Sequence, residues 1–129
     1  MPKGNDIALV DIVRDRYRYH PNILIVGSER VAESTLQGLS PLFAGPTHTC
    51  ILPGPLDLPR AGCAALILRN VDALNTEQQA ELWRWLESGL QVPVVSVSSS
   101  SVFPLVTSGS FSARLYYRLN IILEDATPR

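Results

Sequence analysis

The stretch from Ala64 to Gly89 constrains the fold most, because a strand pattern and an amphipathic helix pattern follow each other directly. Its first five residues, Ala64 to Leu68, are all apolar, which is typical of a strand covered on both faces in a parallel sheet. Asn75 and Gln78 then have the spacing of a capping box, and Gly89 suits the left-handed position that ends a helix. The sequence therefore predicts a strand-to-helix unit of the α/β class.

The predicted helix has one face for the core and one for water. The core-facing positions recur every three or four residues: Gln79, Leu82, Trp83, Leu86 and Leu90. The opposite face is charged: Glu77, Glu81, Arg84 and Glu87. We expect Trp83 and Leu86 to lie in the core. Trp85 falls between the two faces, so we expect it to be partly exposed and available for a protein contact.

Length and composition place the chain among single-domain globular proteins. Its 129 residues fit one domain, residues 1–129, and a hydrophobic content of 46% excludes wholesale disorder. No apolar run reaches the roughly 20 residues that a membrane-spanning helix needs. The N-terminus lacks the apolar core of a signal peptide, which predicts a cytoplasmic protein. A formal net charge of -1 gives no basic field for nucleic acid, so we expect no direct DNA binding.

The residues that bind metals are too few and too scattered for a metal site. The chain has two cysteines, Cys50 and Cys63, and two histidines, His20 and His48, without the paired spacing of zinc ligands. Both cysteines adjoin apolar strand patterns, where an unpaired cysteine behaves as a small buried hydrophobe. We therefore predict neither a metal nor any other cofactor.

The remaining periodic segments alternate between strand and helix patterns, as in a parallel α/β sheet. A helix is predicted from Asp6 to about Tyr17, and its arginines are either solvated or form a basic contact surface. The other predicted elements are a strand over Asn22–Val26, a helix over Glu29–Leu39, strands over Thr47–Leu52 and Val92–Val97, a helix ending in LYYRLN at Leu115–Asn120, and a last strand over Asn120–Leu123.

The junction after the first predicted strand is where a phosphate-binding loop would lie. In the register of GxxxxGK[ST], Gly27 matches the first glycine, Ala32 replaces the second, Glu33 replaces the lysine and Ser34 matches the hydroxyl position. A carboxylate about 4 Å from a phosphate charge would cost roughly 4 kcal/mol at an effective dielectric near 20. Lys3, the only lysine, precedes every predicted strand, so no other register supplies one.

Two segments resemble the AAA+ ATPase domain of bacterial enhancer-binding proteins, which activate sigma-54 RNA polymerase. They are LILRNVDAL together with the following helix up to ESG, and LYYRLN. The resemblance implies a three-layer P-loop NTPase-like fold with a five-stranded parallel sheet in the order 5-1-4-3-2 and no lid subdomain. It places Arg69 and Asn70 where the family has the acidic pair that positions magnesium and activates water. Ser99 stands at the nucleotide-sensing asparagine, and Ser112 at the arginine that acts on a neighbouring subunit.

The resemblance also implies what this chain lacks and what it retains. Only residues Ile51 to Ala61 connect the second and third strands, where the family inserts the GAFTGA loop that contacts the sigma factor. Arg118 of LYYRLN is retained, and Arg114 replaces an aspartate. The two arginines share a helix face, which is either solvated or able to bind an anion or a partner.

Two functional hypotheses follow from the resemblance. The first is an ATPase-dead AAA+ module in bacterial transcription regulation that works by protein contact, with an active enhancer-binding ATPase or another copy of itself as partner. The alternative is an atypical nucleotide-binding protein or switch that uses a modified P-loop. DNA binding through the arginine faces has no recognition motif to support it.

Overall fold

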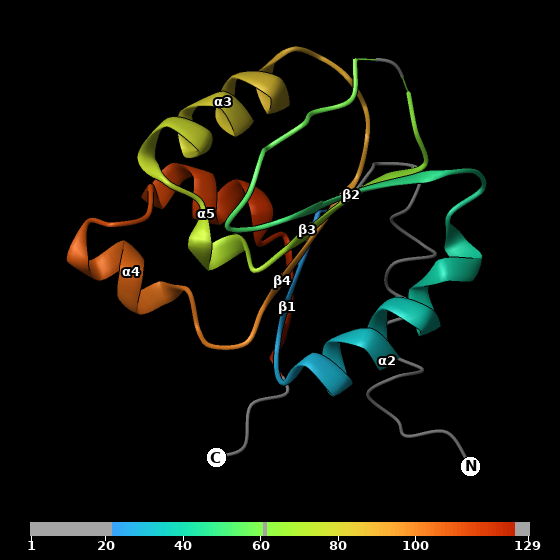
Figure 1. The fold of residues 1–129 in the computed structure, drawn as a ribbon, viewed down its shortest axis with the longest axis horizontal. Coiled ribbons are helices and arrows are strands. Elements are labelled where there is room, and N and C mark those ends of the chain that lie inside the picture. The colour runs from blue at the N-terminus through green and yellow to red at the C-terminus, as the bar shows by residue number, and fades with distance from the viewer. Residues whose placement is uncertain (1–21, 61, 126–129) are drawn as a thin grey trace.

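The computed structural model describes residues 22–60 and 62–125, and its helices lie on both sides of a central sheet (Figure 1). The helix predicted from Asp6 to Tyr17 lies outside the described residues. The elements in chain order are β1 (Ile23–Val26), α2 (Glu29–Leu39), β2 (Thr47–Ile51), β3 (Ala65–Arg69), α3 (Thr76–Glu87), β4 (Val94–Ser98), α4 (Phe103–Ser108), α5 (Ala113–Leu119) and β5 (Ile122–Asp125). Short 3-10 turns cover Ser40–Leu42 and Val71–Ala73.

All five strands are parallel and lie in the order β2-β3-β4-β1-β5. This is the predicted order 5-1-4-3-2 read from the other edge, so the predicted fold class is confirmed. The strands β1, β3 and β4 are interior, and their residues are almost all buried because helices cover both faces. The carboxyl ends of parallel strands meet at one edge, where ligands bind in open α/β sheets.

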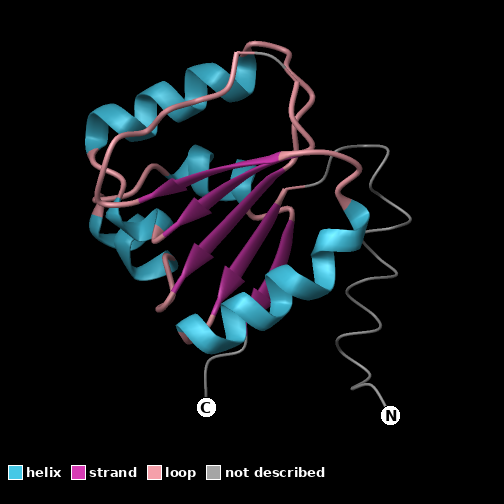
Figure 2. Cartoon of the chain, turned by 45° about the vertical axis from the view of Figure 1, so that its right-hand side comes forward, coloured by secondary structure: helices cyan, strands magenta, loops and turns pink. Residues whose placement is uncertain are grey.

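Two apolar cores of unequal size lie on the two faces of the sheet. Figure 2 shows the sheet between α2 on one side and α3, α4 and α5 on the other. The core beneath α2 is small: Ile23, Ile25, Ala32, Leu36, Leu39, Val95 and Val97. The core beneath the other helices contains seventeen buried residues, from Leu24 to Leu119. Among the described residues, most of the apolar burial is therefore on the α3–α5 face.

The helix α3 begins and ends as the sequence predicts. The Asn75 side chain accepts a hydrogen bond from the Gln78 amide at 2.8 Å, and the Gln78 side chain accepts one from the Asn75 amide at 3.1 Å. Gly89 follows the helix with a φ of 90°, a left-handed conformation that glycine adopts without strain. Both helix-terminus predictions are confirmed.

A buried glutamine connects three segments beneath α3. Gln79 is 7% exposed, and its side-chain amide donates to the carbonyl oxygens of Leu74 and Ser110, each at 3.0 Å. Its Oε1 atom accepts from the Ser112 amide at 2.8 Å. A buried amide is tolerated only where its hydrogen bonds are made, so Gln79 holds the start of α5 against α3.

Three predictions of detail are wrong. The chain forms an additional helix, α4, whose six residues are too few for a helical period to show in the sequence. The last strand begins at Ile122 rather than Asn120, because Asn120 caps the end of α5. The paired tyrosines of LYYRLN are expected from the sequence to be packing residues; Tyr116 is buried, but Tyr117 is 58% exposed and does not pack in the core.

Within residues 22–60 and 62–125, no helix has the length and apolarity that a membrane crossing requires.

Candidate functional site

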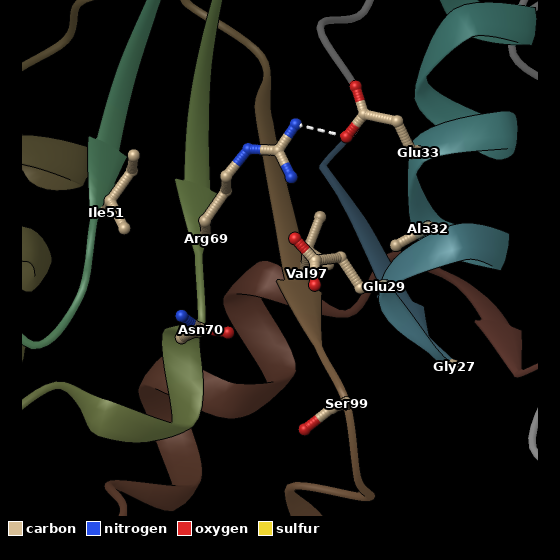
Figure 3. A pocket seen from close by; sticks show the side chains of 9 residues that line it. All are labelled: Gly27, Glu29, Ala32, Glu33, Ile51, Arg69, Asn70, Val97 and Ser99. Carbon is tan, nitrogen blue, oxygen red and sulfur yellow. Dashed lines mark hydrogen bonds and ion pairs between the residues drawn. The ribbon is translucent and has the colours of Figure 1, made fainter.

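A cavity of about 560 Å³ lies at the carboxyl ends of the strands, between α2 and β3 (Figure 3). Its lining residues are Gly27, Glu29, Ala32, Glu33, Ile51, Arg69, Asn70, Val97 and Ser99. Six of the seven positions that the sequence assigns to a degenerate nucleotide site are among them. The seventh, Ser34, is exposed on α2 and lines a shallow surface groove instead.

An ion pair joins the two sides of this cavity. The Nη2 atom of Arg69 on β3 donates to the Oε2 atom of Glu33 on α2 at 2.6 Å. The Arg69 side chain is 26% exposed and that of Glu33 is 48% exposed, so the pair lies at the cavity margin. The two residues that the resemblance places at the family's lysine and aspartate positions therefore pair with each other.

The connection after β1 differs from the open loop of the pattern GxxxxGK[ST], because residues 29–31 of that register already lie in α2. Only Gly27 and Ser28 separate β1 from α2, and the Ser28 side chain caps the helix by accepting from the Val31 amide at 3.3 Å. The Gly27 amide donates to the Ser98 carbonyl, and the Ala32 amide to the Ser28 carbonyl, at 3.0 and 2.9 Å. Because these amides bond within the protein, they are not free to surround a phosphate.

Asn70 and Ser99 occupy the floor of the cavity. Asn70 has a left-handed backbone with a φ of 58°, which asparagine adopts more readily than most residues. Its side-chain amide donates to the Leu52 carbonyl at 2.9 Å, which ties the end of β3 to the end of β2. Ser99 follows β4 and is exposed. The structure thus gives Asn70 a structural contact, while Ser99 faces the cavity.

Glu29 is a lining residue that the sequence reasoning missed. It lies one turn before Glu33 on α2, and the two side chains extend from the helix toward β3 (Figure 3). The four-residue spacing places them on one helix face, and that signal was available in the sequence. With Arg69 as the one cation among the lining residues, two carboxylates leave a formal charge of -1, which disfavours phosphate groups.

A second candidate region is the outer surface of α3 and α5. The Arg114 guanidinium lies 4.5 Å from the centre of the Trp83 ring, and that of Arg118 lies at 5.8 Å. Arg118 also pairs with Glu87 at 3.1 Å and donates to the Leu86 carbonyl at 3.1 Å. Arg114 is exposed and has no carboxylate partner among the described residues. The shared face predicted for the two arginines therefore exists, but only Arg114 is available to a partner.

Both tryptophans of α3 are half-buried, as predicted for Trp85 but not for Trp83. Trp83 is half-buried at the edge of the larger core, so its full placement in the core is wrong, whereas Leu86 is buried as predicted. The Trp83 ring packs against the larger core, and its outer side is covered by the guanidinium groups of Arg114 and Arg118. Trp85 is half-buried, and its indole N–H donates to the Pro59 carbonyl at 2.8 Å. That bond holds the proline-rich connector against α3.

The cysteines contribute to packing. Cys50 is buried and its thiol donates to the Asp57 carbonyl at 3.3 Å, whereas Cys63 is half-buried. Burial raises the pKa of the Cys50 thiol, so it remains protonated at neutral pH. In the part of the chain that the structure describes, no three His, Cys, Asp or Glu residues are arranged to hold a metal ion.

Comparison with known proteins identifies the class and then the family. The sheet order and the cavity at its carboxyl edge are those of an AAA+-type α/β domain. A family model described as "Sigma-54 interaction domain" matches residues 55–123, more than half of the 129 residues. The chain therefore belongs to the sigma-54 interaction domain family. The match includes Arg69, Asn70 and Ser99 but not α2, so it begins beyond Glu33.

Solved structures with the same fold include NtrX from Brucella abortus. Its complex with ATP has a TM-score of 0.73 and 16% identity, and the alignment covers 98% of this chain and 38% of that chain. Its complex with ADP has a TM-score of 0.72 and 16% identity, covering 98% and 36%. At this identity the likeness shows the fold alone, and this chain spans less than two fifths of the NtrX chains. No curated protein sequence matches this chain significantly.

Proposed function

We propose that this chain is an ATPase-dead sigma-54 interaction domain that acts in bacterial transcription regulation, in the cytoplasm, by contacting another protein. The observation that carries the proposal is the ion pair between Glu33 and Arg69 in the cavity. Phosphoryl transfer requires cationic groups and a metal around the phosphates, together with a residue that orients the attacking water. Here an anion stands at the lysine position, and a cation and an amide stand at the acidic positions.

The backbone supports the same conclusion independently of the side chains. A phosphate-binding loop needs several free amides, and the two-residue connection between β1 and α2 leaves the Gly27 and Ala32 amides bonded within the protein. Restoring a lysine at position 33 would therefore not rebuild the loop. This argues against enzymatic function more strongly than any one substitution.

A nucleotide titration tests the first half of the proposal. We expect no detectable binding when millimolar ATP and magnesium are added to the purified protein in a calorimeter, and no phosphate release. Labelled ATP in an equilibrium-binding assay gives a second readout. A magnesium-dependent dissociation constant in the micromolar range would overturn the proposal and favour the alternative, a nucleotide switch that uses the open cavity.

The surface proposed for the protein contact is the exposed part of α5 beside α3. Trp83 holds the Arg114 guanidinium at the surface, and Tyr117 is exposed one turn further along the same helix. Arginine and aromatic residues dominate the binding energy of protein interfaces. We propose an active AAA+ enhancer-binding ATPase or a second copy of this chain as the partner.

A matched pair of variants tests the contact. The wild type, Arg114→Glu and the control Arg84→Glu would each be mixed with an active enhancer-binding ATPase and analysed by light scattering and pull-down. Arg84 is exposed on α3, so its replacement makes the same charge change elsewhere. Arg118 is left unchanged because it donates hydrogen bonds to the Glu87 carboxylate and the Leu86 carbonyl, and its replacement would remove both. Loss of association in the Arg114 variant alone supports the proposal.

Two outcomes would contradict the contact proposal. Equal association by the wild type and both variants would exclude this surface. Formation of open promoter complexes by sigma-54 polymerase with this chain as the sole activator would show that it is not an inactive module.

A further inference from the structure

We propose that Arg69 is a latent anion-binding residue, and that Glu33 is a built-in ligand that occupies it and keeps phosphate-bearing molecules out of the cavity. This rests on the proposed function, in which the wild-type cavity holds no nucleotide. The ion pair would then be an autoinhibitory contact within the cavity rather than a support for the fold.

The geometry of Arg69 supports an anion-binding role. Its side chain is only 26% exposed, and its guanidinium lies between β3 and α2 within the cavity lining (Figure 3). A guanidinium has five N–H donors arranged to bind a carboxylate or a phosphate in a bidentate manner. Among the described residues, Arg69 makes one side-chain hydrogen bond, from its Nη2 atom to a single carboxylate oxygen of Glu33. Donors therefore remain for another anion of the same class.

The surroundings of Glu33 explain why it can act as a replaceable ligand. Its carboxylate is on an exposed part of α2, with 48% of the side chain exposed, so releasing it from Arg69 returns it to water. Pairs that are exposed to this degree contribute little to stability. Glu33 nevertheless repels an incoming phosphate while it competes for the same donors, so both effects lower the affinity of the cavity for phosphate.

Glu29 provides a matched control for the effect of charge. It lies on the same helix face and lines the same cavity, but it has no ion pair with Arg69. Removing either carboxylate changes the cavity charge by one unit. Only removal of Glu33 frees the guanidinium. Comparing the two variants therefore separates the effect of cavity charge on phosphate binding from the effect of freeing the Arg69 guanidinium.

The experiment compares wild type, Glu33→Ala, Glu29→Ala and the double variant Glu33→Ala/Arg69→Ala by calorimetry with inorganic pyrophosphate at low salt. We expect Glu33→Ala to bind pyrophosphate at least about tenfold more tightly than the wild type or Glu29→Ala, and the double variant to lose the gain. Glu33→Gln, which keeps the side-chain volume, should show a smaller gain. ATP in a parallel titration shows whether a nucleoside adds affinity beyond the phosphates.

Circular dichroism and thermal unfolding establish that each variant is folded. An equal gain in Glu29→Ala would overturn the proposal, because net charge alone would then explain binding. No gain in either Glu33 variant, or a gain that survives loss of Arg69, would also overturn it. These outcomes differ from the one that would contradict the proposed function, which is ATP binding by the wild-type protein.

Discussion

The α3–α5 face of the sheet and the cavity beside α2 contain interactions of opposite kinds. On the α3–α5 face, a large apolar core is completed by a capping box and by the fully bonded amide of Gln79. At the cavity, the main side-chain contact is one partly exposed ion pair between Glu33 and Arg69. Apolar burial and satisfied buried hydrogen bonds contribute most to stability, whereas exposed ion pairs contribute little.

This difference separates the interactions that stabilise the fold from the side chains that line the cavity. Substitutions at the cavity can invert charges at little cost in stability, because those side chains lie near water. Replacing side chains of the α3–α5 core with charged ones would instead leave buried polar groups without hydrogen-bond partners. Under the proposed function, the domain has lost its nucleotide chemistry while retaining its fold.

The largest expected effect is from removal of a core side chain on the α3–α5 face. Leu86→Ala should lower the free energy of unfolding by about 2–5 kcal/mol, because it removes buried methyl groups and leaves a cavity. Urea denaturation followed by tryptophan fluorescence measures it. The control Glu81→Ala, on the exposed side of α3, should change stability by less than about 0.5 kcal/mol. Similar midpoints for the two variants would show that Leu86 is not a core residue.

The next largest loss of stability is expected from replacing the buried side-chain amide of Gln79. Gln79→Leu keeps the volume of the side chain but leaves the Leu74 and Ser110 carbonyls and the Ser112 amide without their partner. We expect a loss of about 1–3 kcal/mol in the free energy of unfolding. Gln91→Leu, at an exposed position, is the matched control. A neutral or stabilising Gln79→Leu would mean that burial matters more than hydrogen bonding there.

A smaller effect is expected at the start of α3. Asn75→Ala removes the side chain that accepts from the Gln78 amide, which should cost about 1 kcal/mol in the free energy of unfolding. Thermal unfolding of this variant beside Thr76→Ala, one residue along and exposed, measures the contribution of the cap. Equal melting temperatures in the two variants would argue against a stabilising capping box.

The smallest effect is expected at the cavity. A double-mutant cycle with Glu33→Ala, Arg69→Ala and the double variant should give a coupling energy of about 0.2–1 kcal/mol at low salt. It should fall when salt is raised to about 1 M, where the Debye length is near 3 Å. A coupling of about 2 kcal/mol or more would show that the pair supports the fold, and the contrast between the two regions would then fail.

Much of the fold was predictable because local patterns specify its elements. The capping residues and the apolar runs located α2, α3 and four strands within a few residues. The resemblance supplied the strand order, which periodicity does not contain. The missed helix α4 is too short for a helical period, although Pro104 in its first turn and Gly109 at its end are ordinary boundary signals.

The candidate site was predictable in part. Positions matched to a phosphate-binding loop and an acidic pair did converge on one cavity, because parallel strands end at the same edge. Ser34 was misplaced, because α2 begins at Glu29 and carries that residue to the outer surface of the helix. Glu29 was not predicted, because it is not a position of the phosphate-loop pattern although it lies one turn before Glu33 on α2.

The sequence by itself determined the α/β class and the ends of helix α3. These depend on residue type and local spacing. Only the tertiary structure showed that Glu33 and Arg69, 36 residues apart, pair with each other, and that Trp83 packs against Arg114 rather than deep in the core. Such contacts depend on how the helices lie across the sheet. No local pattern along the chain specifies which distant residues this arrangement brings together.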